Sequence, residues 1–189
     1  MHRFPCGDTA LDFVGTLRAR RTAEPLEMLA APAHLDAWFS ESGLIDTGPT
    51  SQQIDVAKAV VLREAIYTLV AGRLDGRSHD APAVAVVNDA ARRPSSVPEL
   101  TPSGRRVTAT PEQALSSIAR VAIEILGGSD AELLKECGRP ECTQIYLDRS
   151  RGSRREWCAM ETCGNKMKAA AYRARKRGNP PIQHVGGRH

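Results

Sequence analysis

Aromatic residues are scarce in this sequence: two tryptophans, three tyrosines and three phenylalanines make up 4% of its 189 residues. The chain is nevertheless 41% hydrophobic, which is enough to bury one core. That core must come mainly from aliphatic side chains and alanine, which suit helices of moderate length. The composition therefore predicts a body that is mostly α.

Long hydrophobic runs are also missing. No stretch approaches the roughly 20 apolar residues that cross a bilayer. The first residues, MHRFPCGDTALDFVGTL, lack the basic segment and apolar stretch of a secretory leader. We therefore expect a cytoplasmic protein with no membrane partner. Thiols stay reduced in that compartment, so clustered cysteines are expected to be metal ligands and not disulfides.

Charge is unevenly divided along the chain. Residues 1–134 hold 13 Lys/Arg against 17 Asp/Glu, a net charge of −4, whereas residues 135–189 hold 13 against 5, a net charge of +8. Solvated surface is the default explanation of charge, but such asymmetry indicates that the basic segment meets a polyanion.

Hydrophobic periodicity and capping residues predict a series of helices. They are expected within residues 7–21, 31–43, 51–76, 80–93 and 110–128. Two short strands are expected around the turn Pro-Ser-Gly in residues 97–110. The last helix has the strongest local signals, because Thr110 can cap it, Pro111 suits its first position and Gln113 completes a capping box.

Two of these helices carry more specific expectations. In the first, Asp8 is a candidate N-cap, and an apolar face is expected from Ala10, Phe13, Val14 and Leu17. The longest should have Ser51 as its N-cap and be central to the core. Its expected buried face consists of Ile54, Ala57, Val61, Ala65 and Leu69.

The N-terminal part offers few candidates for chemistry. Its histidines are scattered, and no nucleophile, base and orienting group can be assembled, so we expect no enzyme; a pocket around Asp8, Asp12 and Arg63 would argue otherwise. Asp8 and Asp12 could hold a cation or ligand, although capping and a solvated face are simpler roles. Cys6 stands alone and is expected to be a buried apolar group.

The other four cysteines are Cys137, Cys142, Cys158 and Cys163. Two close pairs, each separated by four residues and joined by a fifteen-residue insert, are typical of a structural Zn²⁺ site with four thiolate ligands. A catalytic zinc is disfavoured because four cysteines leave no position for water. A disulfide pair or a redox switch remains the alternative.

Local propensity around the cysteines predicts a small folding unit. Residues 143–148 and 155–158 look like two strands joined by the turn Arg-Ser-Arg-Gly-Ser, and residues 164–177 look helical. On a helical wheel, Cys163, Met167, Ala170, Ala171 and Ala174 share one face, which we expect to pack over the zinc core.

The expected fold class is thus mostly α. It comprises a helical N-terminal domain with a short β-hairpin over residues 1–134, a treble-clef-like zinc finger of knuckle, hairpin and helix over residues 135–178, and a flexible tail over residues 179–189.

Basic residues of the turn and of the final helix should form one positive surface suited to phosphates and to the major groove of DNA. The candidate nucleic-acid-binding residues are Arg149, Arg151, Arg154, Arg155, Lys166, Lys168, Tyr172, Arg173, Arg175, Lys176 and Arg177. One or two of the arginines could instead serve the thiolates of the zinc site, whose net charge is negative.

Residues 137–177 resemble the CGNR zinc finger, which is named for the motif that begins at its last cysteine. The stretches ALDFVGTL, LREAIY and VNDAA resemble the ABATE domain that precedes this finger in a family of stress-induced bacterial transcription regulators. The resemblance implies the same four cysteine ligands. It also matches Asp148, Ser150, Arg154, Arg155 and Trp157 to motif positions.

Three positions depart from the family pattern. Lys166 replaces the arginine of the motif, Glu156 intervenes before Trp157, and Gly15 stands where asparagine is usual. Lysine keeps the charge but loses the bidentate fork.

The resemblance implies a regulator that binds DNA through the finger, with the N-terminal domain as a sensor of a small-molecule effector or as a dimerisation unit. The alternative is a zinc-stabilised module for RNA or a protein partner, in which Trp157 or Tyr172 contacts bases or an interface.

Overall fold

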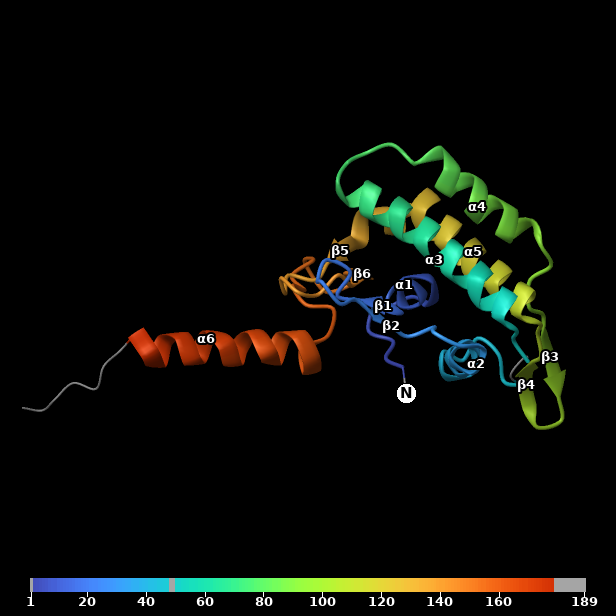
Figure 1. Ribbon diagram of the computed structural model, residues 1–189, viewed down its shortest axis with the longest axis horizontal. Helices are drawn as coiled ribbons and strands as arrows, with labels where there is room; N and C mark the ends of the chain where they lie inside the picture. The colour runs from blue at the N-terminus through green and yellow to red at the C-terminus, as the bar shows by residue number, and fades with distance from the viewer. Residues whose placement is uncertain (1, 48–49, 179–189) are drawn as a thin grey trace, which may run out of the picture.

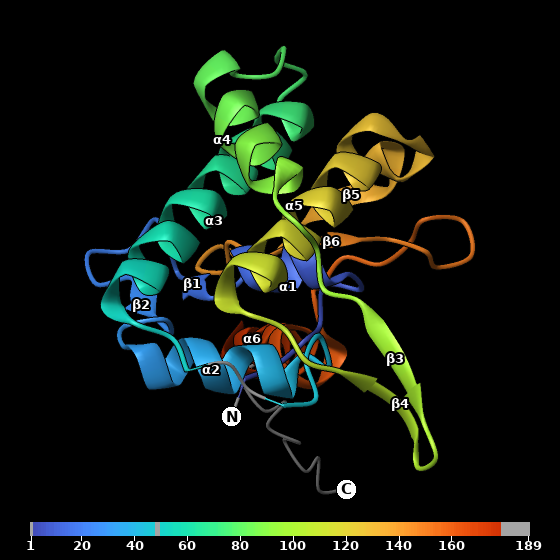
Figure 2. The same cartoon turned by 90° about the vertical axis from the view of Figure 1, so that its right-hand side faces the viewer.

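The computed structural model describes residues 2–47 and 50–178, and the tail expected at 179–189 lies outside the described residues. Its body is built on three helices that pack on one another: α3 (Gln53–Leu74), α4 (Ala81–Arg92) and α5 (Pro111–Gly127). The short helix α1 (Thr9–Val14) packs against α3 and α5, and α2 (Pro32–Glu41) packs against α3 (Figures 1 and 2). The described residues are mostly helical, as the composition predicts.

The start of α5 confirms the predicted capping box. The Thr110 hydroxyl accepts a hydrogen bond from the backbone N–H of Gln113 at 3.2 Å, and the Gln113 side chain accepts one from the backbone N–H of Thr110 at 2.9 Å. These bonds satisfy two N–H groups that the helix itself cannot pair. Pro111 occupies the first turn, where its missing N–H costs nothing.

The buried face of α3 differs from the predicted one. Ala65 and Leu69 are buried, but Ile54 and Val61 remain 58% and 56% exposed. The helix is covered by α1 on one side and by α4 and α5 on another, so its buried residues spread over a wider arc. The buried apolar positions are Val56, Ala59, Leu62, Ala65, Ile66, Leu69 and Val70.

The N-cap of α3 was also predicted one residue early. Gln52 is the cap, and its backbone N–H donates to the carboxylate of Asp55 at 2.9 Å. Ser51 instead donates its hydroxyl and its backbone N–H to the carboxylate of Asp36 in α2. Ser51 therefore joins two helices.

The first helix is shorter than its periodicity suggests. Asp8 caps α1 as predicted, accepting from the backbone N–H of Ala10 at 2.9 Å. The helix ends at Val14, where the Thr16 hydroxyl donates to the Phe13 carbonyl at 2.7 Å. Leu17 belongs to strand β1 (Leu17–Arg18), which pairs antiparallel with β2 (Leu26–Glu27), and not to the helix.

The remaining N-terminal elements agree with the predictions. Helix α2 buries Leu35, Trp38 and Phe39, and Gly43 follows it with a φ of 72°, a left-handed conformation that glycine adopts without strain. Strands β3 (Pro98–Thr101) and β4 (Gly104–Val107) form the expected antiparallel hairpin.

The C-terminal segment begins with a 3₁₀ turn, η1 (Ser129–Leu133), and a hairpin of β5 (Leu134–Glu136) and β6 (Ile145–Leu147). The π-helical turn η2 (Met160–Gly164) then leads into α6 (Asn165–Gly178). Knuckle, hairpin and helix are thus all present, but the strand partner was predicted wrongly: residues 145–147 pair with residues 134–136, and residues 155–158 form no strand. The hairpin therefore carries the first cysteine pair in its connecting loop.

One hydrophobic core connects the helical body to this hairpin. Ile145, Tyr146 and Leu147 are all at most 2% exposed, and β6 contacts α1. The four clustered cysteines belong to the same core. Among the helices of the described residues, none combines the length and the apolarity needed to cross a bilayer.

Candidate zinc centre and basic surface

The four clustered cysteines meet at one point. Cys137 and Cys142 lie in the loop between β5 and β6, Cys158 precedes η2, and Cys163 lies within it. Their Sγ atoms all lie within 4.8 Å of one another, and all four residues are buried. The predicted ligand set is therefore assembled from two turns that are far apart in sequence.

The distances fit a tetrahedral zinc ion. Zn–S bonds of about 2.3 Å give sulfur–sulfur separations of about 3.8 Å in a regular tetrahedron. The Sγ atom of Cys158 lies 3.8 Å from that of Cys142 and 3.6 Å from that of Cys163. With four thiolates the coordination is complete, so the ion is structural and would leave no position for a reacting water.

The thiols of the cluster shift one another's pKa values in opposite directions. The hydrogen bond between the Cys142 and Cys158 thiols lowers the pKa of Cys142 to about 5 and raises the pKa of Cys158 well above its usual range, while burial raises the pKa of Cys163. The backbone N–H of Cys158 points to the Sγ atom of Cys137 at 3.4 Å. Such donors stabilise sulfur charge in a zinc site.

The Trp157 ring packs closely against two glycines of the finger. A side chain at Gly138 would press on its ring, with Cβ 3.2 Å from Cζ3, and one at Gly164 would lie 3.1 Å from its Cδ1. A Cβ at Gly164 would also collide with the sulfur of Met160. The glycine of the Cys163-Gly164-Asn165-Lys166 motif is thus required by close packing beside the last ligand.

Asp148 organises the loop between the cysteine pairs. Its buried carboxylate accepts hydrogen bonds from the backbone N–H and the hydroxyl of Ser150, at 3.0 and 2.6 Å, and from the backbone N–H of Arg155 at 3.1 Å. Lys135 completes its surroundings at 2.7 Å. The hydrogen bond from Lys135, followed by those from Ser150, holds the pKa of Asp148 well below its usual range. The loop is therefore rigidly built.

Two predicted nucleic-acid contacts are engaged within the protein. Arg155 donates to the carbonyls of Trp157, Pro5 and Cys158, the first two at 2.9 and 2.7 Å, and its guanidinium lies 4.3 Å from the centre of the Tyr146 ring. Arg149 donates to the carbonyl of Gly7 at 3.0 Å and to Asp130 at 2.6 Å. Both arginines hold the loop on the body, and neither donates to a sulfur of the described cysteines.

These contacts form a clamp on the N-terminal segment. Three consecutive carbonyls, those of Pro5, Cys6 and Gly7, accept hydrogen bonds from Arg155, from the backbone N–H of Leu147 and from Arg149 respectively. The segment lies directly before α1, so the finger and the helical body are joined by main-chain contacts as well as by the core.

The other predicted cations stay free for a partner. Arg151 and Arg154 are exposed, and so are all the basic residues of α6 and Tyr172, which is 60% exposed. In the described chain, their side chains donate no hydrogen bond and form no ion pair. The cations of α6 are Lys166, Lys168, Arg173, Arg175, Lys176 and Arg177, and the helix contains no acidic residue.

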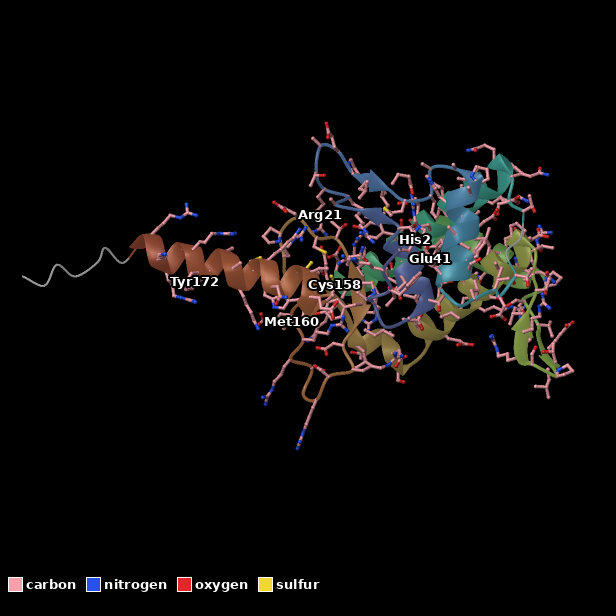
Figure 3. The ribbon with its side chains drawn as sticks, turned by 90° about the horizontal axis from the view of Figure 1, so that it is seen from below. His2, Arg21, Glu41, Cys158, Met160 and Tyr172 are labelled. Carbon is pink, nitrogen blue, oxygen red and sulfur yellow. The ribbon has the colours of Figure 1, made fainter. Side chains whose placement is uncertain are left out.

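The predicted packing of α6 over the zinc core is wrong. Met167 is half-buried, but Ala170, Ala171 and Ala174 are exposed. The helix leaves the finger beside Cys158 and runs away from the body, with Tyr172 on its outer part (Figures 1 and 3). Only its first turn, through Cys163 and η2, is attached to the zinc site.

The N-terminal candidates make contacts within the fold. Asp8 caps α1, and Asp12 is buried and accepts from the backbone N–H of Cys6 at 2.9 Å. Burial raises the pKa of Asp12 to about 6. Cys6 is fully buried, as predicted, and its thiol donates to Gln144 at 3.2 Å. Arg63 lies in a separate network with Glu27 and Glu64.

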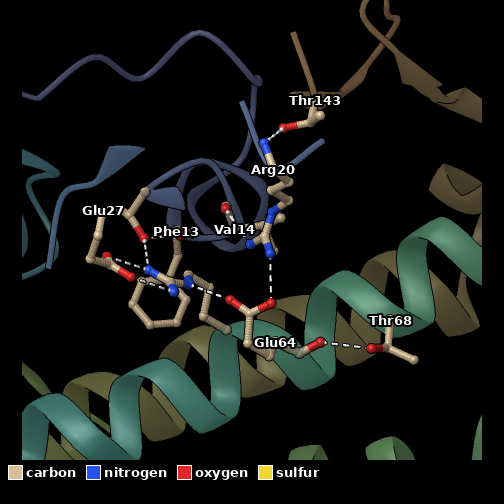
Figure 4. A network of polar contacts seen from close by, with 9 residues as sticks. Phe13, Val14, Arg20, Glu27, Glu64, Thr68 and Thr143 are labelled. Atoms are coloured by element: carbon tan, nitrogen blue, oxygen red, sulfur yellow. Dashed lines mark hydrogen bonds and ion pairs between the residues drawn. The ribbon is translucent and has the colours of Figure 1, made fainter. Parts of the chain in front are cut away.

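Sequence reasoning missed this network. Arg63, 1% exposed, binds both carboxylate oxygens of Glu27 at 2.6 and 2.7 Å and one of Glu64 at 2.8 Å (Figure 4). Arg20 binds the other oxygen of Glu64 at 2.6 Å and lies over the Tyr67 ring. The stretch LREAIY contains Arg63, Glu64 and Tyr67, and a charged pair within an apolar helix was the available signal.

Comparison with known families agrees with this geometry. Residues 7–129 match the ABATE family model, described as "Putative stress-induced transcription regulator", and residues 134–176 match the CGNR zinc finger. No curated protein matches the chain significantly. The clustered cysteines fall within the second match and the Arg63 network within the first. The chain therefore belongs to the ABATE family and carries a CGNR zinc finger with a structural zinc site.

Proposed function

We propose that this protein is a bacterial transcription regulator that binds duplex DNA through α6 and the exposed arginines of the finger loop. The observation that carries the proposal is the free, basic α6, anchored at its first turn to a rigid zinc centre. A helix has the width of the major groove, and lysine and arginine side chains neutralise phosphates. In this proposal the protein acts in the cytoplasm and catalyses no reaction.

The zinc site gives α6 a fixed root. Cys163 is a ligand just before the helix begins, and the neighbouring Gly164 packs against Trp157. A mobile helix loses conformational entropy when it binds a partner, and this loss weakens binding. Fixing the first turn of α6 at the zinc site reduces that loss. The exposed Arg151 and Arg154 lie on the loop that Asp148 organises, and in this proposal they add to the positive surface of α6.

Fluorescence anisotropy of a labelled mixed-sequence duplex tests the proposal. If about six phosphates are contacted, log affinity should fall against log salt with a slope of about −5. The double variant Arg173→Gln/Lys176→Gln should make the slope shallower by about 2, because two phosphate contacts are lost. The matched control, Lys58→Gln/Arg92→Gln, removes the same charges from exposed positions on α3 and α4 and should leave the slope unchanged.

Two results would count against the proposal. Equal losses in both double variants would mean that overall charge, and not α6, attracts the DNA. Stronger competition by single-stranded RNA than by unlabelled duplex would favour the alternative of an RNA-binding module, in which the exposed Tyr172 stacks on bases.

A further inference from the structure

A cleft of about 730 Å³ lies beside the zinc centre at the root of α6. Its volume falls within the roughly 300–1,000 Å³ of small-molecule sites. One wall belongs to the N-terminal half of the chain: Arg3, Pro5, Arg18, Ala19 and Leu26. The rest of the lining comes from the finger and α6, and its charged residues are Arg139, Lys166, Glu141 and Glu161. A ligand in this cleft would touch both parts of the protein.

Two guanidinium groups in the cleft lack adequate partners. Arg18 is half-buried, and no acceptor or carboxylate among residues 2–47 and 50–178 meets its side chain; its Nε atom is shielded from water and unpaired. The Nε atom of Arg139 is also shielded and unpaired, and its only carboxylate neighbour in the described chain is Glu141 at 3.6 Å. Removing charge from water without a partner is costly, so these groups are suited to an anion.

The zinc centre offers another explanation for these cations. Four thiolates around Zn²⁺ carry a net charge of −2, and Cys142, Cys158 and Cys163 line the floor of the cleft. However, neither Arg18 nor Arg139 donates a hydrogen bond to any of these sulfurs. The donors of both arginines therefore remain available, and an experiment can separate the two roles.

The apolar part of the cleft narrows the class of ligand. Leu26 is 53% exposed, and Pro5, Ala19 and Ala169 lie along the same cleft. Inorganic phosphate would leave this surface uncovered, whereas an apolar group attached to the anion would cover it. We propose that the cleft binds a small organic anion, whose carboxylate or phosphate meets Arg18 and Arg139 and whose apolar body lies on Leu26 and its neighbours.

Such a ligand would connect the body to the DNA-binding helix. Asn165, Lys166 and Ala169 belong to the first turns of α6, while Arg18 and Leu26 belong to the paired strands β1 and β2. An anion bridging them would fix the direction of α6 relative to the body. This regulatory consequence rests on the proposed function, but the existence of the ligand site does not.

Calorimetric titration of the zinc-loaded full chain with phenyl phosphate tests the site. We expect saturable binding at one site, with inorganic phosphate and phenol each binding at least about tenfold more weakly, because each supplies only half of the interaction. Arg18→Gln and Arg139→Gln should each weaken phenyl phosphate binding by at least about tenfold, the loss expected for one charge-assisted hydrogen bond. Arg92→Gln, on the exposed surface of α4, should bind as the unaltered protein does.

Zinc release to a coloured chelator is measured on the same variants. Unchanged release rates support a ligand role for the two arginines. Faster release with undiminished phenyl phosphate binding would overturn the proposal, because the arginines would then serve the thiolates. Absence of saturable binding, or inorganic phosphate binding as tightly as phenyl phosphate, would also overturn it.

Duplex DNA distinguishes the source of the anion. If the duplex displaces phenyl phosphate competitively, and Arg18→Gln weakens DNA binding as much as the α6 double variant does, then the cleft holds a DNA phosphate and the small-ligand proposal is wrong. Phenyl phosphate that stays bound in the presence of DNA supports it. The titration needs no DNA, so a failure of the proposed function leaves its result intact.

Discussion

The side-chain amide of Gln144 donates a hydrogen bond of 3.0 Å to the backbone carbonyl of Gly15, across 129 residues of sequence. Gln144 is buried beside the zinc knuckle, and Gly15 ends α1. A Cβ atom at Gly15 would collide with the amide of Gln144. The glycine at this position therefore makes room for a glutamine from the finger.

We expect Gly15→Ala to destabilise the protein by about 1 to 3 kcal/mol. The added methyl group would displace the Gln144 amide from its bonds to Gly15 and Cys6, and each lost bond costs about 1 kcal/mol. Urea denaturation of the zinc-loaded protein measures the change. In the double variant Gly15→Ala/Gln144→Ala the two losses should be less than additive; strict additivity would mean that the two residues do not interact.

Arg63→Met should destabilise the protein by about 3 kcal/mol, because it leaves two carboxylates of a largely buried ion-pair network without their shared cation. This value lies at the low end for such pairs, since Glu27 and Glu64 are partly exposed. The control is Arg73→Met, which lies on the same helix as Arg63 and breaks an exposed ion pair with Glu132 of η1. It should cost less than about 1 kcal/mol. Comparable losses in the two variants, read from urea midpoints, would contradict the role of the network.

We expect variants of the neighbouring residues Arg155 and Arg154 to affect different properties: the first the stability of the protein, the second its DNA binding. Arg155→Gln removes the bonds to the carbonyls of Pro5 and Cys158, and we expect a loss of about 2 kcal/mol in the free energy of unfolding and faster zinc release. Arg154→Gln should change stability by less than about 0.5 kcal/mol, because its side chain is exposed. It should nevertheless weaken DNA binding in the anisotropy assay. A stable Arg155→Gln protein with an unchanged zinc-release rate would show that the contacts of Arg155 are dispensable for stability and for zinc retention.

Asp12 should give the stability a distinctive pH dependence. Burial raises the pKa of its carboxyl from 3.8 to about 6, so the folded protein holds this proton more tightly than the unfolded chain. Stability from this group is therefore greatest below pH 3.8 and is lost as pH rises to about 6. The maximum loss is about 3 kcal/mol, since each unit of pKa corresponds to about 1.4 kcal/mol.

The variant Asp12→Asn keeps an oxygen that accepts from Cys6 but cannot ionise. The difference in unfolding free energy between the unaltered protein and this variant should therefore fall between about pH 4 and pH 7. Protonation of the zinc ligands affects both proteins alike and cancels in the difference. A flat difference curve would show that Asp12 titrates normally.

Zinc removal should unfold the finger and weaken the body. The two tryptophans report on these parts separately, because Trp157 lies in the finger and Trp38 in the N-terminal core. In a Trp38→Phe protein, chelation should shift the emission of Trp157 to longer wavelength as the metal-dependent segment unfolds. In a Trp157→Phe protein, the emission of Trp38 should remain unchanged at room temperature while its thermal midpoint falls, because β6 and the clamp support α1. An unchanged midpoint would mean that the two parts are energetically independent.

Signals confined to a few neighbouring residues were readable from the sequence. The capping box of Thr110 and Gln113, the cap at Asp8 and the close cysteine pairs all depend on short-range geometry, and each is present in the structure. The helical propensity of residues 165–178 is local in the same way, because alanine, lysine and arginine favour a helix whatever surrounds them. The sequence by itself therefore determined the helices, the ligand set and the charge of the final helix.

Tertiary structure alone decided how those elements meet. Which arc of α3 is buried depends on how many helices cover it, and so Ile54 and Val61 remain exposed although their spacing suits a core. The partner of β6 depends on a pairing across the zinc knuckle, and the free position of α6 depends on the absence, in the described chain, of a surface for its alanines. Arg149 and Arg155 look the same as Arg151 and Arg154 in sequence; only the fold brings the first two to the carbonyls of the N-terminal segment and leaves the others in solvent.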